Sequence, residues 1–279
     1  MKLTTLEKMA PWDWPVDAGT TILQTLEDDQ ADASERLLAA QLAGDLTVFN
    51  DELAHALLAI LQRSSEPDEL RGQAAVSLGP GLEQADIDGF DDPGDLAICD
   101  DTLKNIQESF HRLYADGDVP KHVRRRILEA SVRAPQDWHH DAVSAAYAGD
   151  DEDWILTAVF SMRWVRGFDD QILESLDSDN QHIRYQAVCA AGTWELDAAW
   201  PLVSRLVKSE GINKRLLLAS IDAVANIRPQ EAGVVLVDLT DSEDDEIVEA
   251  VHEAMAMAEA ASDDELDDMD DNALLSPFV

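Results

Sequence analysis

The sequence predicts an all-α protein, a right-handed α-solenoid in which about five or six helix pairs stack as a superhelix. Apolar residues recur at helical spacing along most of the chain, the helices recur with a period of about 31 residues, and short polar turns separate them. The chain has 279 residues, 46% of them hydrophobic. This is enough to fold as a repeat array rather than remain disordered.

The N-terminal elements are helices expected at about 17–28, 31–44 and 50–63. Their spacing departs from the period of the later helices. We therefore expect residues 1–64 to form an N-terminal helical cap or a degenerate repeat. Trp12 and Trp14 are placed to cover the apolar face that the first helix pair exposes.

Helix pairs are expected over residues 65–261. The apolar faces of the second helices of the pairs begin at Leu70, Val123, Ile155, Ile183, Leu217 and Ile247. From Val123 onward these starts are 32, 28, 34 and 30 residues apart. The first helices are marked by Val143, Ile172, Val203 and Val235, which keep the same period.

Polar turns at 149–153, 177–180, 209–213 and 241–245 precede second helices. Their Asp, Asn and Ser side chains are expected to cap the helix starts. An insertion is expected at 79–101, where Gly79-Pro80-Gly81 leads into the acidic stretch 86–95. Asp86 and Asp88 suggest a calcium loop, but the third ligand position and the final Glu of an EF-hand are missing. A solvated loop without a metal is the favoured interpretation.

A resemblance to a known family rests on three segments. They are Asp68 to Gly79, the dipeptide Val123-Arg124, and Asp179 to Gly192, in which a polar turn precedes an apolar residue, an Arg and Ala-rich spacing. This pattern resembles the second helix of HEAT repeats, in particular the short bacterial and archaeal repeats of the phycobilin-lyase-like type. The resemblance implies an α-solenoid that serves as a scaffold or adaptor, and only occasionally as an enzyme.

The chain carries 58 acidic and 20 basic side chains, a net charge of -38. Such a field repels nucleic acid and anionic membranes, so neither is an expected partner. The acidity fits either a high-salt source or a mesophilic protein with an acidic tail, since residues 241–279 hold 15 acids and no Lys or Arg. Residues 262–279 are expected as a flexible acidic tail, whose Leu274, Leu275, Phe278 and Val279 form a candidate docking motif.

The compartment expected is the cytoplasm. The two cysteines, Cys99 and Cys189, provide no disulfide framework, and the sequence shows neither a signal peptide nor a transmembrane stretch.

A basic stretch, Lys121, Arg124, Arg125 and Arg126, is the least expected feature of this acidic chain. Residues 104–133 hold seven basic and four acidic side chains. One interpretation is a partner-binding site on the face formed by the second helices, with arginines that bind carboxylates. The other is a ladder in which Arg71, Arg124, Arg184 and Arg215 bond neighbouring inter-helix turns. The ladder is favoured for Arg71, Arg184 and Arg215, and both interpretations stay open for Arg125 and Arg126.

Two further residues are candidates for partner binding. Trp164 lies between Arg163 and Arg166 and could form a stacking surface, although packing between repeats is the alternative. Arg184 opens a second helix and shares its face with the basic stretch. The histidines form no catalytic constellation, and no catalytic residue, cofactor or metal is expected.

The function expected is a non-enzymatic scaffold or adaptor that binds an acidic or extended segment of another protein on its second-helix face. The alternative is a lyase-like maturation factor or enzyme that holds a small anionic ligand in the groove. A HEAT-like nucleic-acid repair module is a third class, which the charge disfavours.

Overall fold

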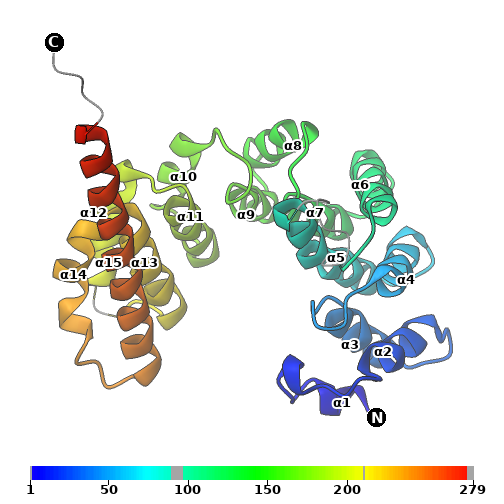
Figure 1. Ribbon diagram of the computed structural model, residues 1–279. Coiled ribbons are helices and arrows are strands. Elements are labelled where there is room, and N and C mark those ends of the chain that lie inside the picture. The colour runs from blue at the N-terminus through cyan, green and yellow to red at the C-terminus, as the bar shows by residue number, and fades with distance from the viewer. Residues whose placement is uncertain (1, 89–96, 210, 275–279) are drawn as a thin grey trace. The chain divides into compact units, whose positions relative to one another are not determined.

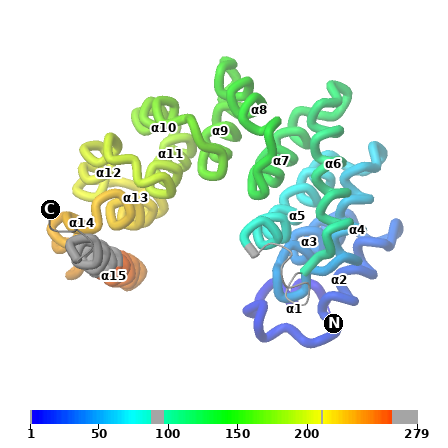
Figure 2. The backbone as a smooth tube through the Cα atoms, turned by 45° about the horizontal axis from the view of Figure 1, so that its top comes forward, coloured from blue at the N-terminus to red at the C-terminus, as the bar shows by residue number. Residues whose placement is uncertain are grey.

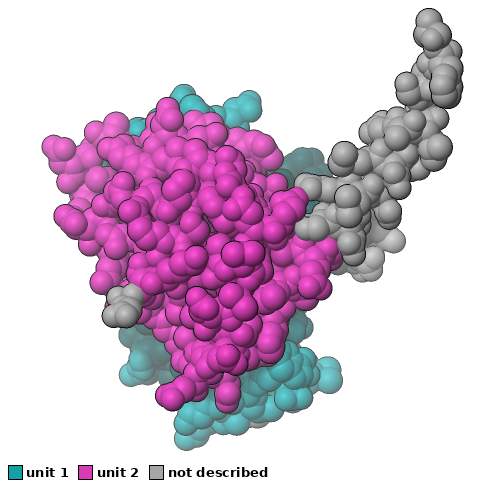
Figure 3. Space-filling view, turned by 90° about the vertical axis from the view of Figure 1, so that its left-hand side faces the viewer, with its two compact units in different colours: residues 1–145 teal, residues 146–279 magenta. Residues whose placement is uncertain are grey.

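The computed structural model describes residues 2–88, 97–209 and 211–274, with side chains described up to residue 260 (Figure 1). Every regular element within these ranges is a helix. The chain divides into two compact units, residues 1–145 (unit 1) and 146–279 (unit 2), coloured separately in Figure 3. Each unit is described by itself.

Unit 1 is made of helix pairs that follow one another along the chain. Its elements are α1 (Leu3–Leu6), the 3-10 turn η1 (Pro11–Asp13), α2 (Ala18–Glu27), α3 (Ala33–Ala43), α4 (Asp51–Gln62), α5 (Asp68–Asp88), α6 (Asp100–Ala115), α7 (Lys121–Ser131) and α8 (Trp138–Tyr147), whose last residues pass into unit 2. The first helices α2, α4 and α6 contact one another in one layer, and the second helices α3, α5 and α7 do so in the other. The N-terminal pair α2–α3 thus stacks on α4–α5 in the manner of a repeat.

Unit 2 repeats this arrangement, and Figure 2 follows its backbone path. Its elements are α9 (Glu152–Ser161), α10 (Asp169–Ser175), α11 (Gln181–Thr193), η2 (Asp197–Ala199), α12 (Trp200–Val207), α13 (Lys214–Ile227), α14 (Pro229–Leu236), η3 (Val237–Leu239) and α15 (Asp245–Leu274). The helices α9, α11, α13 and α15 pack in sequence as one layer. The prediction of an all-α solenoid built from helix pairs is confirmed.

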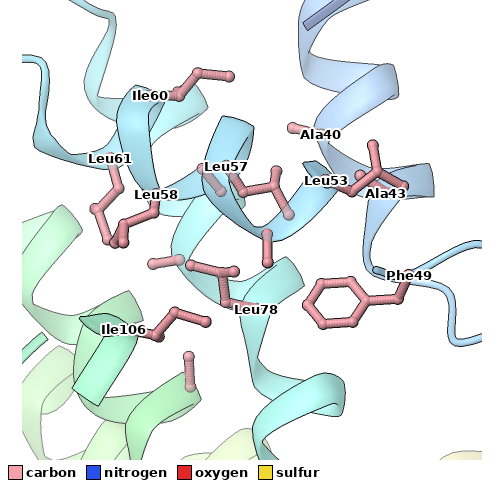
Figure 4. Close-up of a cluster of buried hydrophobic side chains, with 14 of the residues drawn as sticks. Ala40, Ala43, Phe49, Leu53, Leu57, Leu58, Ile60, Leu61, Leu78 and Ile106 are labelled. Atoms are coloured by element: carbon pink, nitrogen blue, oxygen red, sulfur yellow. The ribbon is translucent and has the colours of Figure 1, made fainter. Parts of the chain in front are cut away.

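The core of unit 1 is a continuous apolar layer between first and second helices. Leu57 and Leu61 of α4, Leu78 of α5 and Ile106 of α6 are fully buried and converge in this layer (Figure 4). The spacing of four residues between Leu57 and Leu61 is the helical periodicity that predicts the fold. Phe49 closes the layer on one side, and its ring is 4% exposed.

Glycines allow second helices to approach closely. A Cβ added at Gly192 of α11 would lie 3.0 Å from both the Cα and the Cβ of Ala223 on α13. A Cβ at Gly81 of α5 would lie only 2.0 Å from a ring carbon of Phe49. A side chain at Gly192 would push α11 and α13 apart, and one at Gly81 would displace the ring of Phe49, which lies in the loop between α3 and α4.

The polar turns cap second helices as the sequence predicts. The carboxylate of Asp151 accepts the Asp153 backbone N–H at 3.1 Å, and the Asn180 and Asn213 side chains accept backbone N–H groups of α11 and α13. Asp244 accepts the Glu246 N–H at the start of α15. Each contact satisfies a donor that a helix start leaves unpaired.

The expected loop at 79–101 begins later than predicted, because α5 continues through Pro80 to Asp88. Leu82 and Ala85 are buried and extend the apolar face of Leu78, and this packing outweighs the loss of one N–H donor at Pro80. Asp86 and Asp88 therefore lie on a helix. Residues 89–96, which hold the rest of the suggested calcium loop, lie outside the described residues.

The C-terminal segment also differs from expectation in its described part. The backbone of residues 262–274, expected as a flexible tail, continues α15 as a helix. The residues of the suggested docking motif, Leu274, Leu275, Phe278 and Val279, lie outside the part whose side chains are described. Over the described ranges, none of the helices has the length and apolarity that crossing a membrane requires.

Candidate functional site

The predicted partner-binding residues fall into both units, so the structure describes them as two separate surfaces. Lys121, Arg124, Arg125 and Arg126 open helix α7 of unit 1, whereas Trp164 and Arg184 belong to unit 2.

The basic stretch on α7 is engaged in contacts within unit 1. The Arg124 Nε–H donates to the backbone oxygen of Tyr114 at 2.8 Å, and the guanidinium lies 5.3 Å from the centroid of the Tyr114 ring. Arg126 forms an ion pair with Glu129 at 2.6 Å. Lys121 and Arg125 have contacts of their own as well. Each of the four cations of this stretch is therefore engaged in a contact, and the charge of Arg126 is compensated by Glu129.

Arg124 belongs to a ladder that fastens the second helix of a pair to the end of the first. Arg36, Arg71 and Arg124 are each the fourth residue of a second helix, and each donates to the carbonyl ten residues earlier. The acceptors are Leu26 O at 3.4 Å, Leu61 O at 3.0 Å and Tyr114 O at 2.8 Å. These contacts satisfy carbonyl oxygens at the ends of first helices.

In unit 2, only α11 among the described second helices has an arginine as its fourth residue. Arg184, the fourth residue of α11, donates to the Ser178 oxygen through Nε at 3.1 Å and through Nη2 at 2.6 Å. The ladder prediction is confirmed in part: Arg71, Arg124 and Arg184 bond carbonyl oxygens, but only Arg184 bonds an inter-helix turn, because Leu61 and Tyr114 lie in the last turns of α4 and α6. The ladder residue Arg36 was missed. Arg215 departs from the ladder, because it is the second residue of α13 and lies 4.1 Å from the centroid of the Tyr185 ring.

Trp164 lies in the turn after α9 and is half-buried. Its ring centroid is 4.9 Å from that of Phe160 and 5.2 Å from the Arg163 guanidinium carbon. Arg166 lies instead over Trp194, at 4.3 Å, and the Trp194 indole N–H donates to Met162 O at 2.6 Å. Arg163 is thus stacked on Trp164, and Arg166 is stacked on Trp194.

A groove on the second-helix face of unit 2 was not anticipated. It has a volume of about 540 Å³ and is lined by Arg163, Tyr185, Cys189, Lys214, Arg215, Leu218, Ala219, Asp222 and Glu246. Tyr185 and Cys189 stand one turn apart on α11, and Arg215 and Asp222 stand two turns apart on α13. Arg163 comes from the end of α9 and Glu246 from the first turn of α15. Four consecutive second helices or their ends thus build the groove.

The cations of the groove differ in their partners. Lys214 is paired with Asp244 at 2.8 Å and with Glu246 at 2.5 Å. Arg163 and Arg215, in contrast, lie over the rings of Trp164 and Tyr185 and have no ion pair among the described residues. The Nε of Arg163 is buried and has no hydrogen-bond acceptor.

Cys189 lines the groove together with Arg163 and Arg215. Burial raises the pKa of its thiol, and Asp222 adds to this, whereas the charges of Arg163 and Arg215 act in the opposite direction. The thiol is therefore mostly protonated near neutral pH, which disfavours nucleophilic chemistry. The described residues contain no cluster of three or more side chains suited to a metal ion. The groove offers donors and aromatic rings, a combination suited to holding an anion.

Sequence reasoning missed the groove because its residues come from different repeats. Tyr185 and Arg215 are 30 residues apart, one repeat period, so their contact joins neighbouring repeats at corresponding positions. A search for arginines spaced one period from an aromatic residue would have found the pair.

The chain matches no family model and no curated protein. Among solved structures, it is similar to human deoxyhypusine hydroxylase in complex with glycerol, with 17% identity, coverage of 92% of this chain and 88% of that chain, and a TM-score of 0.42. It is also similar to the Escherichia coli protein YibA, with 13% identity, coverage of 89% and 82%, and a TM-score of 0.49. An engineered protein shows 15% identity, coverage of 87% and 96%, and a TM-score of 0.34. None of these similarities assigns an activity to this chain.

Proposed function

We propose that this protein is a non-enzymatic interaction scaffold, built from HEAT-like helix pairs, that receives an acidic and extended segment of a partner protein in the groove of unit 2. One observation carries the proposal. In a chain with 58 acids and 20 bases, Arg163 and Arg215 lie over aromatic rings and form no ion pair among the described residues.

Other arginines of the chain do pair with acids. Arg36, Arg63, Arg126, Arg133 and Arg228 each contact a carboxylate. An arginine stacked on a ring keeps the N–H groups in its plane available for another acceptor. A bound carboxylate can therefore reach Arg163 and Arg215 without first breaking an internal ion pair, which lowers the cost of binding.

The basic stretch on α7 is a weaker candidate for the same role. Arg124 belongs to the ladder and Arg126 is paired with Glu129, so binding there competes with contacts that stabilise unit 1. The alternative of an enzyme or maturation factor that holds a small anion would use the same groove of unit 2. The size of the ligand that binds distinguishes the scaffold from this alternative.

The test is a binding titration with a fluorescently labelled deca-glutamate peptide, which self-repulsion keeps extended. Deca-glutamine is the neutral control peptide. The variant R163E/R215E is compared with R205E/K208E, which makes the same change of charge at exposed residues of α12 and its C-cap. We expect R163E/R215E to weaken binding about tenfold or more, because charge-assisted hydrogen bonds are lost.

The control variant should change the affinity by less than threefold, through the long-range field alone. Equal losses in both double variants would show that only the net charge matters and would contradict the proposal. Tight binding of succinate or inorganic phosphate, with no added affinity for the peptide, would favour the small-ligand alternative.

A further inference from the structure

We infer that Arg163 is the anchor of this groove and that it holds one oxyanion of the bound segment side-on, through its Nε–H and an adjacent Nη–H. The inference rests on the proposed function and adds which group recognises the ligand and which ligand chemistry it recognises. Three observations support it: the position of Arg163, the absence of an acceptor for its Nε–H, and the residues around it.

Arg163 comes directly after Met162, the C-cap residue of α9, and lines the groove. Its side chain is half-buried, and its guanidinium rests on Trp164 at 5.2 Å. A cation at this place is partly shielded from solvent. Its interaction with an anion is therefore stronger than that of an exposed lysine or arginine.

The Nε–H of Arg163 lacks an acceptor, and so does that of Arg36, whose Nη groups donate to Glu66 and Leu26 O instead. The corresponding Nε–H donates to a carbonyl in Arg71, Arg124 and Arg184, and to a carboxylate in Arg228. In Arg163 the Nε is buried without a partner, and within the described part of the chain its guanidinium has no acceptor. A buried donor without a partner costs free energy, which a ligand oxygen can recover by drawing the guanidinium toward the groove.

The neighbours of Arg163 supply the rest of an oxyanion site. Arg215, held over Tyr185 at 4.1 Å, provides a second guanidinium, and the charges of both arginines act on the Cys189 thiol. Both arginines line the same groove as Cys189. Two oxygens on one group, as in a side-chain carboxylate or a phosphate monoester, match the pair of donors on one edge of a guanidinium.

Because Cys189 lines the groove, the rate at which its thiol is alkylated shows whether a peptide occupies the groove. The chain has two cysteines, so C99S leaves Cys189 as its only thiol. Alkylation of Cys189 by iodoacetamide is measured with deca-glutamate, with a peptide in which phosphoserine alternates with glutamine, and with deca-glutamine. We expect both anionic peptides to slow alkylation and deca-glutamine to leave it unchanged. The more protective of the two identifies the source of the oxyanion.

The anchor is tested by R163K and R215K in the C99S background. Lysine keeps the charge but cannot present two donors side by side. We expect R163K to weaken deca-glutamate binding about tenfold, and R215K to weaken it less than threefold. Equal losses in the two variants, or an R163K affinity within twofold of the parent, would overturn the anchor assignment and leave the proposed function standing. Absence of peptide binding by the parent protein would overturn both.

A measurement on the wild-type chain tests the inference independently, should R163K disturb folding. The Nε–H signals of the arginines are recorded by NMR while deca-glutamate is added. One Nε–H signal, assigned to Arg163 by its loss in R163K or R163Q, should move as a new acceptor is gained. An unchanged Arg163 signal at saturating peptide would contradict the inference.

Discussion

The ion pair between Arg36 and Glu66 gives the sharpest stability prediction. Glu66 lies in the turn between α4 and α5 and accepts two hydrogen bonds from Arg36, at 2.8 and 2.9 Å, and one from Arg63 at 3.0 Å. The Arg36 and Glu66 side chains are only 9% and 7% exposed. The change Glu66→Gln removes the negative charge and keeps the shape of the side chain.

The size of the loss in unfolding free energy follows from the burial of the ion pair. Removing one partner of a buried ion pair leaves the other charge uncompensated and costs about 3–5 kcal/mol. The amide oxygen of the introduced glutamine would still accept one hydrogen bond from Arg36, so we expect Glu66→Gln to lower the free energy of unfolding by about 3 kcal/mol.

Urea denaturation followed by circular dichroism measures the change. Glu69→Gln, at an exposed residue one turn away, makes the same change of charge and should stay within about 0.5 kcal/mol of wild type. The double variant Arg36→Met/Glu66→Leu removes both charges and should recover most of the loss.

The same pair predicts a pH dependence. The hydrogen bond from Arg36 lowers the pKa of Glu66 below its ordinary value of 4.5. Its stabilisation is therefore present above pH 4.5 and is lost as the pH falls through the lowered pKa. The difference in unfolding free energy between wild type and Glu66→Gln should therefore decrease toward zero at acidic pH. A Glu66→Gln variant as stable as wild type at pH 7 would refute the reasoning.

Three further predictions concern buried groups. Burial lowers the pKa of His139 from 6.5 to about 4, so acidification from pH 6.5 should lower the free energy of unfolding by up to ~3 kcal/mol. The variant His139→Phe should flatten the slope of unfolding free energy against pH between 6.5 and 5. The control His140→Phe, at an exposed residue, should leave that slope unchanged. Arg71→Met loses the hydrogen bond from a side chain 4% exposed to the last turn of α4, and should cost about 2 kcal/mol in urea denaturation. Gly81→Ala forces a Cβ against Phe49 and should lower the free energy of unfolding by about 1–3 kcal/mol, which lowers the melting temperature. A melting temperature equal to that of wild type would contradict the packing described.

The sequence predicts the helix pairs well because their signal is local. The apolar spacing of second helices such as α11, with Ile183, Ala187 and Ala190, follows from the helical period, and capping residues such as Asn180 mark the starts. Position within a helix also predicts the arginine ladder, since each donor reaches a carbonyl only ten residues away in unit 1.

The features that sequence reasoning misplaced depend on contacts between distant residues. Gly79-Pro80-Gly81 has the local chemistry of a turn, but burial of Leu82 and Ala85 keeps α5 helical to Asp88. The basic stretch on α7 is conspicuous in the sequence, whereas the carbonyl of Tyr114 accepts the Arg124 Nε–H only when α6 and α7 pack together. The groove of unit 2 joins residues 22 to 83 positions apart, from Arg163 to Tyr185 and to Glu246.

The central claim is that particular arginines of unit 2, rather than the overall charge, receive an acidic segment. It is tested most directly by the ratio of the deca-glutamate dissociation constants of R163E/R215E and R205E/K208E, measured side by side at one ionic strength. We expect a ratio of at least about three, because R163E/R215E should bind about tenfold or more weakly than wild type and R205E/K208E less than threefold more weakly. A ratio of one would contradict the claim.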